Sequence, residues 1–195
     1  MGYKILKAIV SGFCYLIFRI KVVGEDNLPN DGSCMVCANH KSNWDPVILI
    51  ISLKRKVHFL AKSELFKFKP LGAILKCAGV IPLKRGYADV GAIKTAMEIL
   101  KCEKVLGMFP TGTRTKNVSD AKPKSGAALI ASRMGTKVVP LYIDATYRIF
   151  SKITIHIDKP IDLLEYKGVK LSAEELDNIS DSIYSKIVDM SNKQG

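Results

Sequence analysis

The chain has 195 residues, of which 48% are hydrophobic and 25% are charged, and this length predicts one domain with a hydrophobic core. The composition excludes a disordered chain, which has fewer apolar groups, and a polytopic membrane protein, which has long uncharged runs. A net charge of +12 predicts an anionic partner such as nucleic acid, anionic lipid, a phosphorylated metabolite or an acidic carrier protein.

The N-terminal segment is the most lipophilic part of the chain. We expect residues 1–21 to form a membrane-associating helix ahead of a domain spanning residues 22–195. The charge-free stretch 8–18 would be about 16 Å long as a helix, against about 30 Å of bilayer hydrocarbon. Flanking basic side chains extend towards anionic headgroups, which favours a monotopic or peripheral position. The alternative is a helix that covers one end of the core.

Strand-like and helical patterns alternate after this segment. Strands are predicted over residues 33–38, 56–61, 80–83, 104–109, 137–144 and 152–158. Helices are predicted over residues 46–53, 64–79 with a break at Pro70, 89–101 with Asp89 as N-cap, 125–135, and 172–190 with a Ser172/Glu175 capping box. The alternation predicts an α/β fold, in which helices cover a central mixed, mostly parallel sheet.

Two of the five cysteines, Cys34 and Cys37, have the spacing of a redox or zinc motif. They lie inside a strand-like run without a second Cys or His pair nearby, so we expect both thiols in the core and no metal site. The odd cysteine count and the lack of a signal-peptide cleavage pattern favour a reducing, cytoplasmic compartment.

Polar residues cluster where three of the predicted strands stop, at 39–45, 84–85 and 111–115. In α/β sheets, ligands usually bind at the carboxyl ends of the strands. We therefore expect these three segments to deliver their polar groups to one edge of the sheet.

His40 and Asp45 are the candidate acid–base pair of the first cluster. Positions five apart differ by about 140° around an ideal helix, so the side chains meet only if a turn separates them. Pro46 suits the first helical position, which predicts Asp45 as N-cap and His40 on the preceding loop. A carboxylate at one ring nitrogen leaves the other to accept a proton from a hydroxyl. The pair is either such a dyad or a polar link between strand and helix.

Four motifs follow one another in order along the chain. They read NHKSNWD (39–45), GVIPLKRG (79–86), FPTGTRT (109–115) and VVPLYI (138–143). The first three resemble Asn-His-x4-Asp, Gly-x-Ile-Pro-x-x-Arg and Phe-Pro-Glu-Gly-Thr-Arg-Ser of the glycerolipid acyltransferases, and the last is similar to the fourth motif of that superfamily. The resemblance covers roughly residues 20–145 and is greatest to the 1-acylglycerol-3-phosphate (lysophosphatidic acid) acyltransferases.

The resemblance implies a reaction. A fatty acyl group would pass from acyl-carrier protein or acyl-CoA to the 2-hydroxyl of lysophosphatidic acid, giving phosphatidic acid for phospholipid biosynthesis. His40 would act as general base and Asp45 would orient it, without an acyl-enzyme and without a metal or redox cofactor. The implied partners are these substrates and an anionic membrane surface on the cytoplasmic face of the cell membrane.

The resemblance also implies a binding site for the phosphate of the acceptor. Arg85 and Arg114, with Lys62, would hold the phosphate, since guanidinium groups bind phosphate bidentately. Gly112 would let the backbone approach the ligand closely, and Thr111 and Thr113 would belong to the same substrate-binding segment.

Thr111 departs from the family pattern, which has glutamate at this position. Threonine keeps a hydrogen-bonding oxygen but loses charge and reach. An altered acceptor and a weakened, lipid-binding relative therefore stay open as alternatives.

The remaining basic residues leave two further questions open. Lys54-Arg55-Lys56 is either a solvated turn or a contact for carrier protein or headgroups. The net charge alone would also allow a nucleic-acid-binding domain, but no recognised module accompanies it, so we expect no nucleic acid partner.

Overall fold

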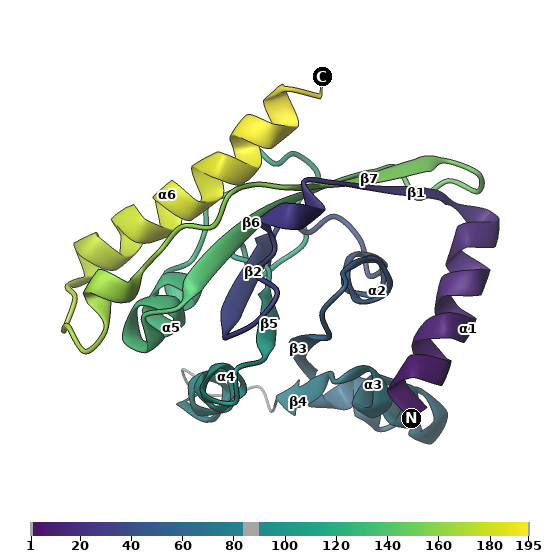
Figure 1. Ribbon diagram of the computed structural model, residues 1–195, viewed down its shortest axis with the longest axis horizontal. Coiled ribbons are helices and arrows are strands. Elements are labelled where there is room, and N and C mark those ends of the chain that lie inside the picture. Colours follow the sequence, from purple (N-terminus) through teal and green to yellow (C-terminus); the bar gives the residue numbers. More distant parts are fainter. Residues whose placement is uncertain (1, 84–89, 195) are drawn as a thin grey trace.

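A seven-stranded sheet runs through the molecule in the order β1-β7-β6-β2-β5-β3-β4 (Figure 1). The structure is a computed structural model that describes residues 2–83 and 90–194. Neighbouring strands are parallel except β6 and β7, which confirms the predicted mixed, mostly parallel sheet. The strands are β1 (Arg19–Val23), β2 (Cys34–Ala38), β3 (Val57–Lys62), β4 (Ile81–Leu83), β5 (Val105–Met108), β6 (Lys137–Ala145) and β7 (Lys152–Ile157).

Helices cover both faces of this sheet, as predicted. One face carries α1 (Gly2–Ile17), α2 (Asp45–Ser52) and α3 (Lys69–Ala78), and the other carries α4 (Val90–Lys101), α5 (Gly126–Met134) and α6 (Ala173–Asn192) (Figure 1). Short 3-10 turns lie at Glu25–Asn27, Ser63–Phe66 and Leu164–Tyr166. Successive strand residues point to opposite faces, so alternate side chains of the central strands β2, β5 and β6 enter two separate hydrophobic cores.

The two cysteines of the C-x-x-C spacing belong to these different cores. Cys34 packs on the α2 side of the sheet and Cys37 on the α5 side, and both are fully buried. Burial raises the pKa of the Cys34 thiol to about 11 and that of Cys37 to about 12. Both therefore stay protonated, and the expectation that they serve packing is confirmed.

The N-terminal helix is shorter than predicted. It ends at Ile17, and residues 19–23 form the edge strand β1, which pairs with β7 from Arg19↔Lys152 to Val23↔His156. Backbone pairing with β7 outweighs continuation of the helix here, and local periodicity contained no sign of that distant partner. Among the described residues, no helix combines the length and apolarity needed to cross a bilayer.

The two sides of α1 differ in what they contact. Its inner side reaches the core through buried Cys14 and the half-buried Leu6 and Val10. Its outer side, which we call the outer apolar face of α1, exposes Ile5, Ile9, Phe13 and Leu16. The helix therefore covers the core, and it also presents an apolar surface to its surroundings.

The basic triplet 54–56 has structural contacts. The Arg55 guanidinium donates to the carbonyl oxygens of Pro29, Asp31, Gly32 and Glu103, over 2.5–3.1 Å. Lys54 pairs with Glu25 at 3.2 Å, and Lys56 lies 4.4 Å from the Tyr3 ring centroid. Arg55 thus joins the loops that precede β2 and β5. This structural role differs from both predictions for the triplet, a solvated turn and a contact for carrier protein or headgroups.

The predicted cap of the last helix is confirmed. Ser172 and Glu175 form the expected capping box at the start of α6. Asp89, the predicted N-cap of the helix that begins at Val90, lies outside the described residues.

Candidate active site

Two of the three predicted polar clusters meet at the carboxyl edge of the sheet. β2 lies between β5 and β6, so the segments that follow β2 and β5 leave the sheet side by side. The Thr115 amide donates to the His40 carbonyl oxygen at 2.8 Å and ties the two segments together. Arg85, of the remaining cluster, lies outside the described residues.

The side chains of His40 and Asp45 are hydrogen-bonded. His40 Nδ1 lies 2.7 Å from Asp45 Oδ2, and the Lys41 and Ser42 amides donate to the same oxygen at 2.7 Å each. The Tyr147 hydroxyl donates to the other oxygen, Oδ1. The Asp45 carboxylate is 1% exposed and accepts from four donors. These hydrogen bonds offset the cost of removing a charged carboxylate from water. Because this carboxylate accepts, His40 carries its proton on Nδ1.

Asp45 does not serve as the N-cap of α2, so that prediction was wrong. Asp45 is the first residue of the helix, and the preceding residue, Trp44, caps it without a side-chain hydrogen bond. The carboxylate instead turns back to the loop, where His40 and two amides occupy Oδ2. Pro46 stands at the second helical position, one residue later than predicted, and still within the first turn.

The His40 ring is fixed on its face as well as its edge. Phe109 stacks on it with centroids 4.1 Å apart and planes at 15°, and Phe59 stacks on Phe109 in turn at 5.5 Å. The side chain of His40 is 18% exposed, so a substrate can reach it. Since Nδ1 faces Asp45, Nε2 is the nitrogen that can take a proton from a hydroxyl.

Asn39 is a site residue to which sequence reasoning gave no role. Its amide donates to the Ile143 carbonyl oxygen at 3.1 Å and accepts from the Ile143 amide at 2.7 Å. This two-way contact fastens the end of β2, just before His40, to β6. Its position directly before His40 in the first motif is the feature of the sequence that could have indicated this role.

The third motif forms a tight turn. The Gly112 amide donates to the Phe109 carbonyl oxygen at 2.9 Å, and Gly112 has φ 68°, a conformation that favours glycine. A Cβ there would meet only the Lys124 side chain, 3.5 Å away. Gly112 is therefore explained by its backbone conformation, and its predicted close approach to a ligand stays a prediction.

Thr111 uses its hydroxyl inside this turn. It is 3% exposed, and its Oγ1 donates to the Thr113 carbonyl oxygen at 2.7 Å, while the Thr113 residue itself is exposed. The oxygen that stands in place of the family carboxylate thus stabilises the loop.

A basic cleft opens beside the dyad. It measures about 470 Å³ and is lined by Lys41, Arg114, Thr115 and Lys116. Arg114 was predicted from the third motif, whereas Lys41 and Lys116 were not, although each adjoins a motif residue. Lys62 is exposed at the carboxyl end of β3, on the same edge of the sheet.

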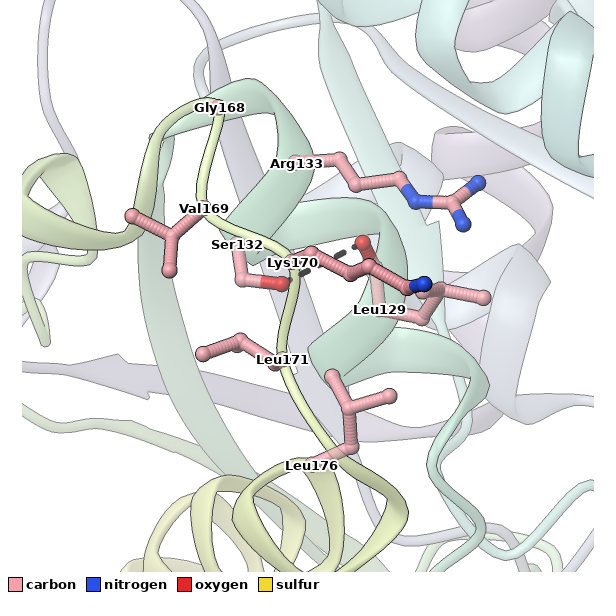
Figure 2. Close-up of a pocket in the computed structure, with 8 residues that line it drawn as sticks. All are labelled: Leu129, Ser132, Arg133, Gly168, Val169, Lys170, Leu171 and Leu176. Atoms are coloured by element: carbon pink, nitrogen blue, oxygen red, sulfur yellow. Dashed lines mark hydrogen bonds between the residues drawn. The ribbon is translucent and has the colours of Figure 1, made fainter.

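A second cavity, of about 240 Å³, lies between the end of α5 and the segment that leads into α6 (Figure 2). Its walls include Arg133 and Lys170, with Leu171 and Leu176 below them. It contains none of the predicted site residues.

Comparison with known proteins adds independent information. A family model described as Acyltransferase matches residues 19–144. A 1-acyl-sn-glycerol-3-phosphate acyltransferase of Bacillus subtilis (strain 168) is 29% identical over 184 residues, which cover 89% of either chain. A chloroplastic 1-acyl-sn-glycerol-3-phosphate acyltransferase of Brassica napus is 33% identical over 69% of this chain and 40% of its own length.

The solved structures include a similar fold. The crystal structure of the 1-acyl-sn-glycerophosphate (LPA) acyltransferase PlsC from Thermotoga maritima superposes with a TM-score of 0.71 at 26% identity. The match covers 94% of this chain and 77% of that one.

Proposed function

The chain belongs to the acyltransferase family, and we propose that it transfers a fatty acyl group from acyl-carrier protein or acyl-CoA to the 2-hydroxyl of lysophosphatidic acid, giving phosphatidic acid. The observation that carries this assignment is the His40–Asp45 hydrogen bond beside a cleft with three cationic side chains. The similar proteins named above include 1-acyl-sn-glycerol-3-phosphate acyltransferases from bacteria and plants.

The dyad accounts for the chemistry without a protein nucleophile. His40 Nε2 takes the proton of the acceptor hydroxyl as its oxygen attacks the thioester carbonyl, and a tetrahedral oxyanion forms. Collapse of this intermediate forms the ester, breaks the carbon–sulfur bond and releases a thiolate, which receives the proton from His40. Asp45 orients the ring and stabilises the transient imidazolium. Proton transfer and charge stabilisation cover each step, so the proposal includes no metal or redox cofactor.

The basic cleft supports a phosphate-bearing acceptor. Lys41, Arg114 and Lys116 line it together, and three cations in one hollow favour a dianionic group. Arg85, from the second motif, and Lys62 stay proposed phosphate contacts on the basis of the family resemblance.

Exposed apolar side chains on two neighbouring helices support contact with a membrane. α1 packs against α3 (Figure 1), and α3 also has two exposed apolar side chains, Leu71 and Ile74. Exposed lysines at 4, 69 and 76 belong to the same two helices, and exposed Lys67 lies just before α3. Apolar groups bordered by cations match the interface of an anionic bilayer, here the cytoplasmic face of the cell membrane, where the acceptor resides.

The test of the reaction is thioester consumption by the purified protein. Lysophosphatidic acid, glycerol 3-phosphate and lysophosphatidylcholine are offered in parallel with acyl-CoA and with acyl-carrier protein as donors. We expect fastest turnover with lysophosphatidic acid. Preference for glycerol 3-phosphate would move the assignment to the first acylation step, and binding without turnover would favour a lipid-binding relative.

The membrane contact is tested separately by co-sedimentation with phosphatidylglycerol and phosphatidylcholine vesicles. Ile9→Asp should weaken binding to the anionic vesicles by roughly tenfold, because it places a charge on the outer apolar face of α1. The matched control is Leu164→Asp, which changes a similarly exposed leucine in another part of the chain. Equal binding by both variants would refute the assignment of this face.

A further inference from the structure

We propose that Tyr147 is a positioning residue, whose hydroxyl holds the Asp45 carboxylate in the rotation that directs Oδ2 at His40 Nδ1. This inference rests on the proposed function, because it assigns Tyr147 a part in preparing His40 as the base. Tyr147 lies outside the four sequence motifs, in the loop between β6 and β7.

The hydrogen bonds of Asp45 are divided unequally between its two oxygens. Oδ2 accepts from His40 and from the Lys41 and Ser42 amides. Among the described residues, Oδ1 accepts from the Tyr147 hydroxyl alone. A buried carboxylate oxygen without a donor is unfavourable, so losing this hydroxyl would favour rotation of the carboxylate or entry of water. Either event would weaken the hold on the His40 tautomer.

The phenol ring of Tyr147 is itself fixed by aromatic contacts. Phe18 meets it edge to face, with centroids 6.1 Å apart at 83°, and meets Trp44 in the same manner at 6.0 Å. Trp44 directly precedes Asp45 in the chain, so Phe18 links the ring of Tyr147 to the residue next to the carboxylate. Phe18 follows α1, and the Phe150 amide donates to the Ile17 carbonyl oxygen at 2.7 Å, which fastens the loop to the end of that helix.

The backbone and the ionisation of Tyr147 agree with a donor role. Its φ of 55° lies in the left-handed region, which a tyrosine adopts only when other contacts hold it there. Burial, and then the charge of Asp45 and its hydrogen bond, raise the pKa of Tyr147 far above its ordinary value. The phenol therefore keeps its proton and donates throughout the pH range of an enzyme.

Tyr147→Phe tests the proposal by removing one hydroxyl while keeping the ring. We expect kcat to fall roughly tenfold, because the bond to the charged Asp45 supports the transition state, while KM for lysophosphatidic acid stays within about twofold. A purely structural role for the loop would disturb acceptor binding and stability instead of kcat alone. The matched control, Tyr166→Phe, removes a phenolic hydroxyl from the 3-10 turn at Leu164–Tyr166, and wild-type kinetics are expected.

A second measurement is independent of turnover. In protein labelled with 15N-histidine, the two ring nitrogens of His40, assigned with His40→Gln, should have widely separated shifts, since Nδ1 alone carries the proton. In Tyr147→Phe these shifts should move closer together as the tautomers mix. Phe18→Leu, which keeps the hydroxyl but removes its ring support, should move them the same way by less.

The two measurements separate the possible failures. Wild-type kcat together with unchanged His40 shifts in Tyr147→Phe and Phe18→Leu would overturn the positioning role. If the wild-type protein consumed no thioester with any acceptor, the proposed function would fail, and the ring shifts would still decide whether Tyr147 positions the dyad.

Discussion

The imidazole of His40 lies nearly parallel to the ring of Phe109, with 4.1 Å between centroids. Asp45 holds the edge of the same imidazole through a 2.7 Å hydrogen bond. A ring that is held on one face and one edge keeps its orientation before substrate arrives. Such preorganisation is what a general base needs, because misplacement by even an ångström slows proton transfer.

Asp45→Asn should lower kcat by roughly 10³-fold or more with a smaller effect on KM, because an amide no longer fixes the His40 tautomer or stabilises the imidazolium. Steady-state kinetics at saturating thioester measure the effect. Asp158→Asn is the control, since that carboxylate follows β7 and accepts from the Lys159 amide. Near-normal turnover in Asp45→Asn would show that the pair is only a polar link between strand and helix.

Arg114→Ala should raise KM for lysophosphatidic acid roughly tenfold, because the basic cleft loses a bidentate phosphate donor. The dependence of KM on salt should weaken at the same time, as one fewer charge pair is screened. Arg133→Ala removes the same side chain from the other cavity (Figure 2) and should leave KM unchanged. Equal effects of the two substitutions would mean that net charge, and not the cleft, attracts the acceptor.

Thr111→Val should lower the free energy of unfolding by about 1 kcal/mol, since it removes the hydrogen bond to the Thr113 carbonyl oxygen from a buried position. Urea denaturation followed by circular dichroism measures the change. Thr95→Val serves as the comparison, because the Thr95 hydroxyl donates to Gly91 on an exposed helix surface. A Thr111→Val protein of full stability would leave the threonine without a role in the turn.

Arg55→Lys should destabilise the fold by about 2 kcal/mol, because one ammonium cannot reproduce charged hydrogen bonds to four separated carbonyl oxygens. Urea denaturation followed by circular dichroism measures this change in the free energy of unfolding. At low temperature, where the variant stays folded, kcat and KM should keep their wild-type values. The Arg55 hydrogen bonds join the loops before β2 and β5, whereas the predicted site residues follow the strands. A raised KM for acyl-carrier protein with unchanged stability would instead assign Arg55 to donor docking.

Elements with a local signal were predicted well. The capping box of α6 depends on residues within one helical turn, and it appears in the structure. The predicted helix over residues 64–79 is interrupted, as expected, but α3 begins only at Lys69, with Pro70 in its first turn, after a 3-10 turn at Ser63–Phe66. The edge strand β1 was missed because its β-structure depends on pairing with β7, more than a hundred residues away. The N-cap role of Asp45 was wrong because local rules consider the helix amides first, whereas the folded loop brings two other backbone amides and the His40 ring to this carboxylate.

The sequence by itself determined the alternation of strands and helices and the facing of His40 towards Asp45, because periodicity and a turn act over a few residues. Only the tertiary structure decided what supports that pair. Tyr147 reaches Asp45 across 102 positions, and Asn39 reaches Ile143 across 104. Such contacts follow from the order in which strands join the sheet, and no spacing along the chain encodes that order.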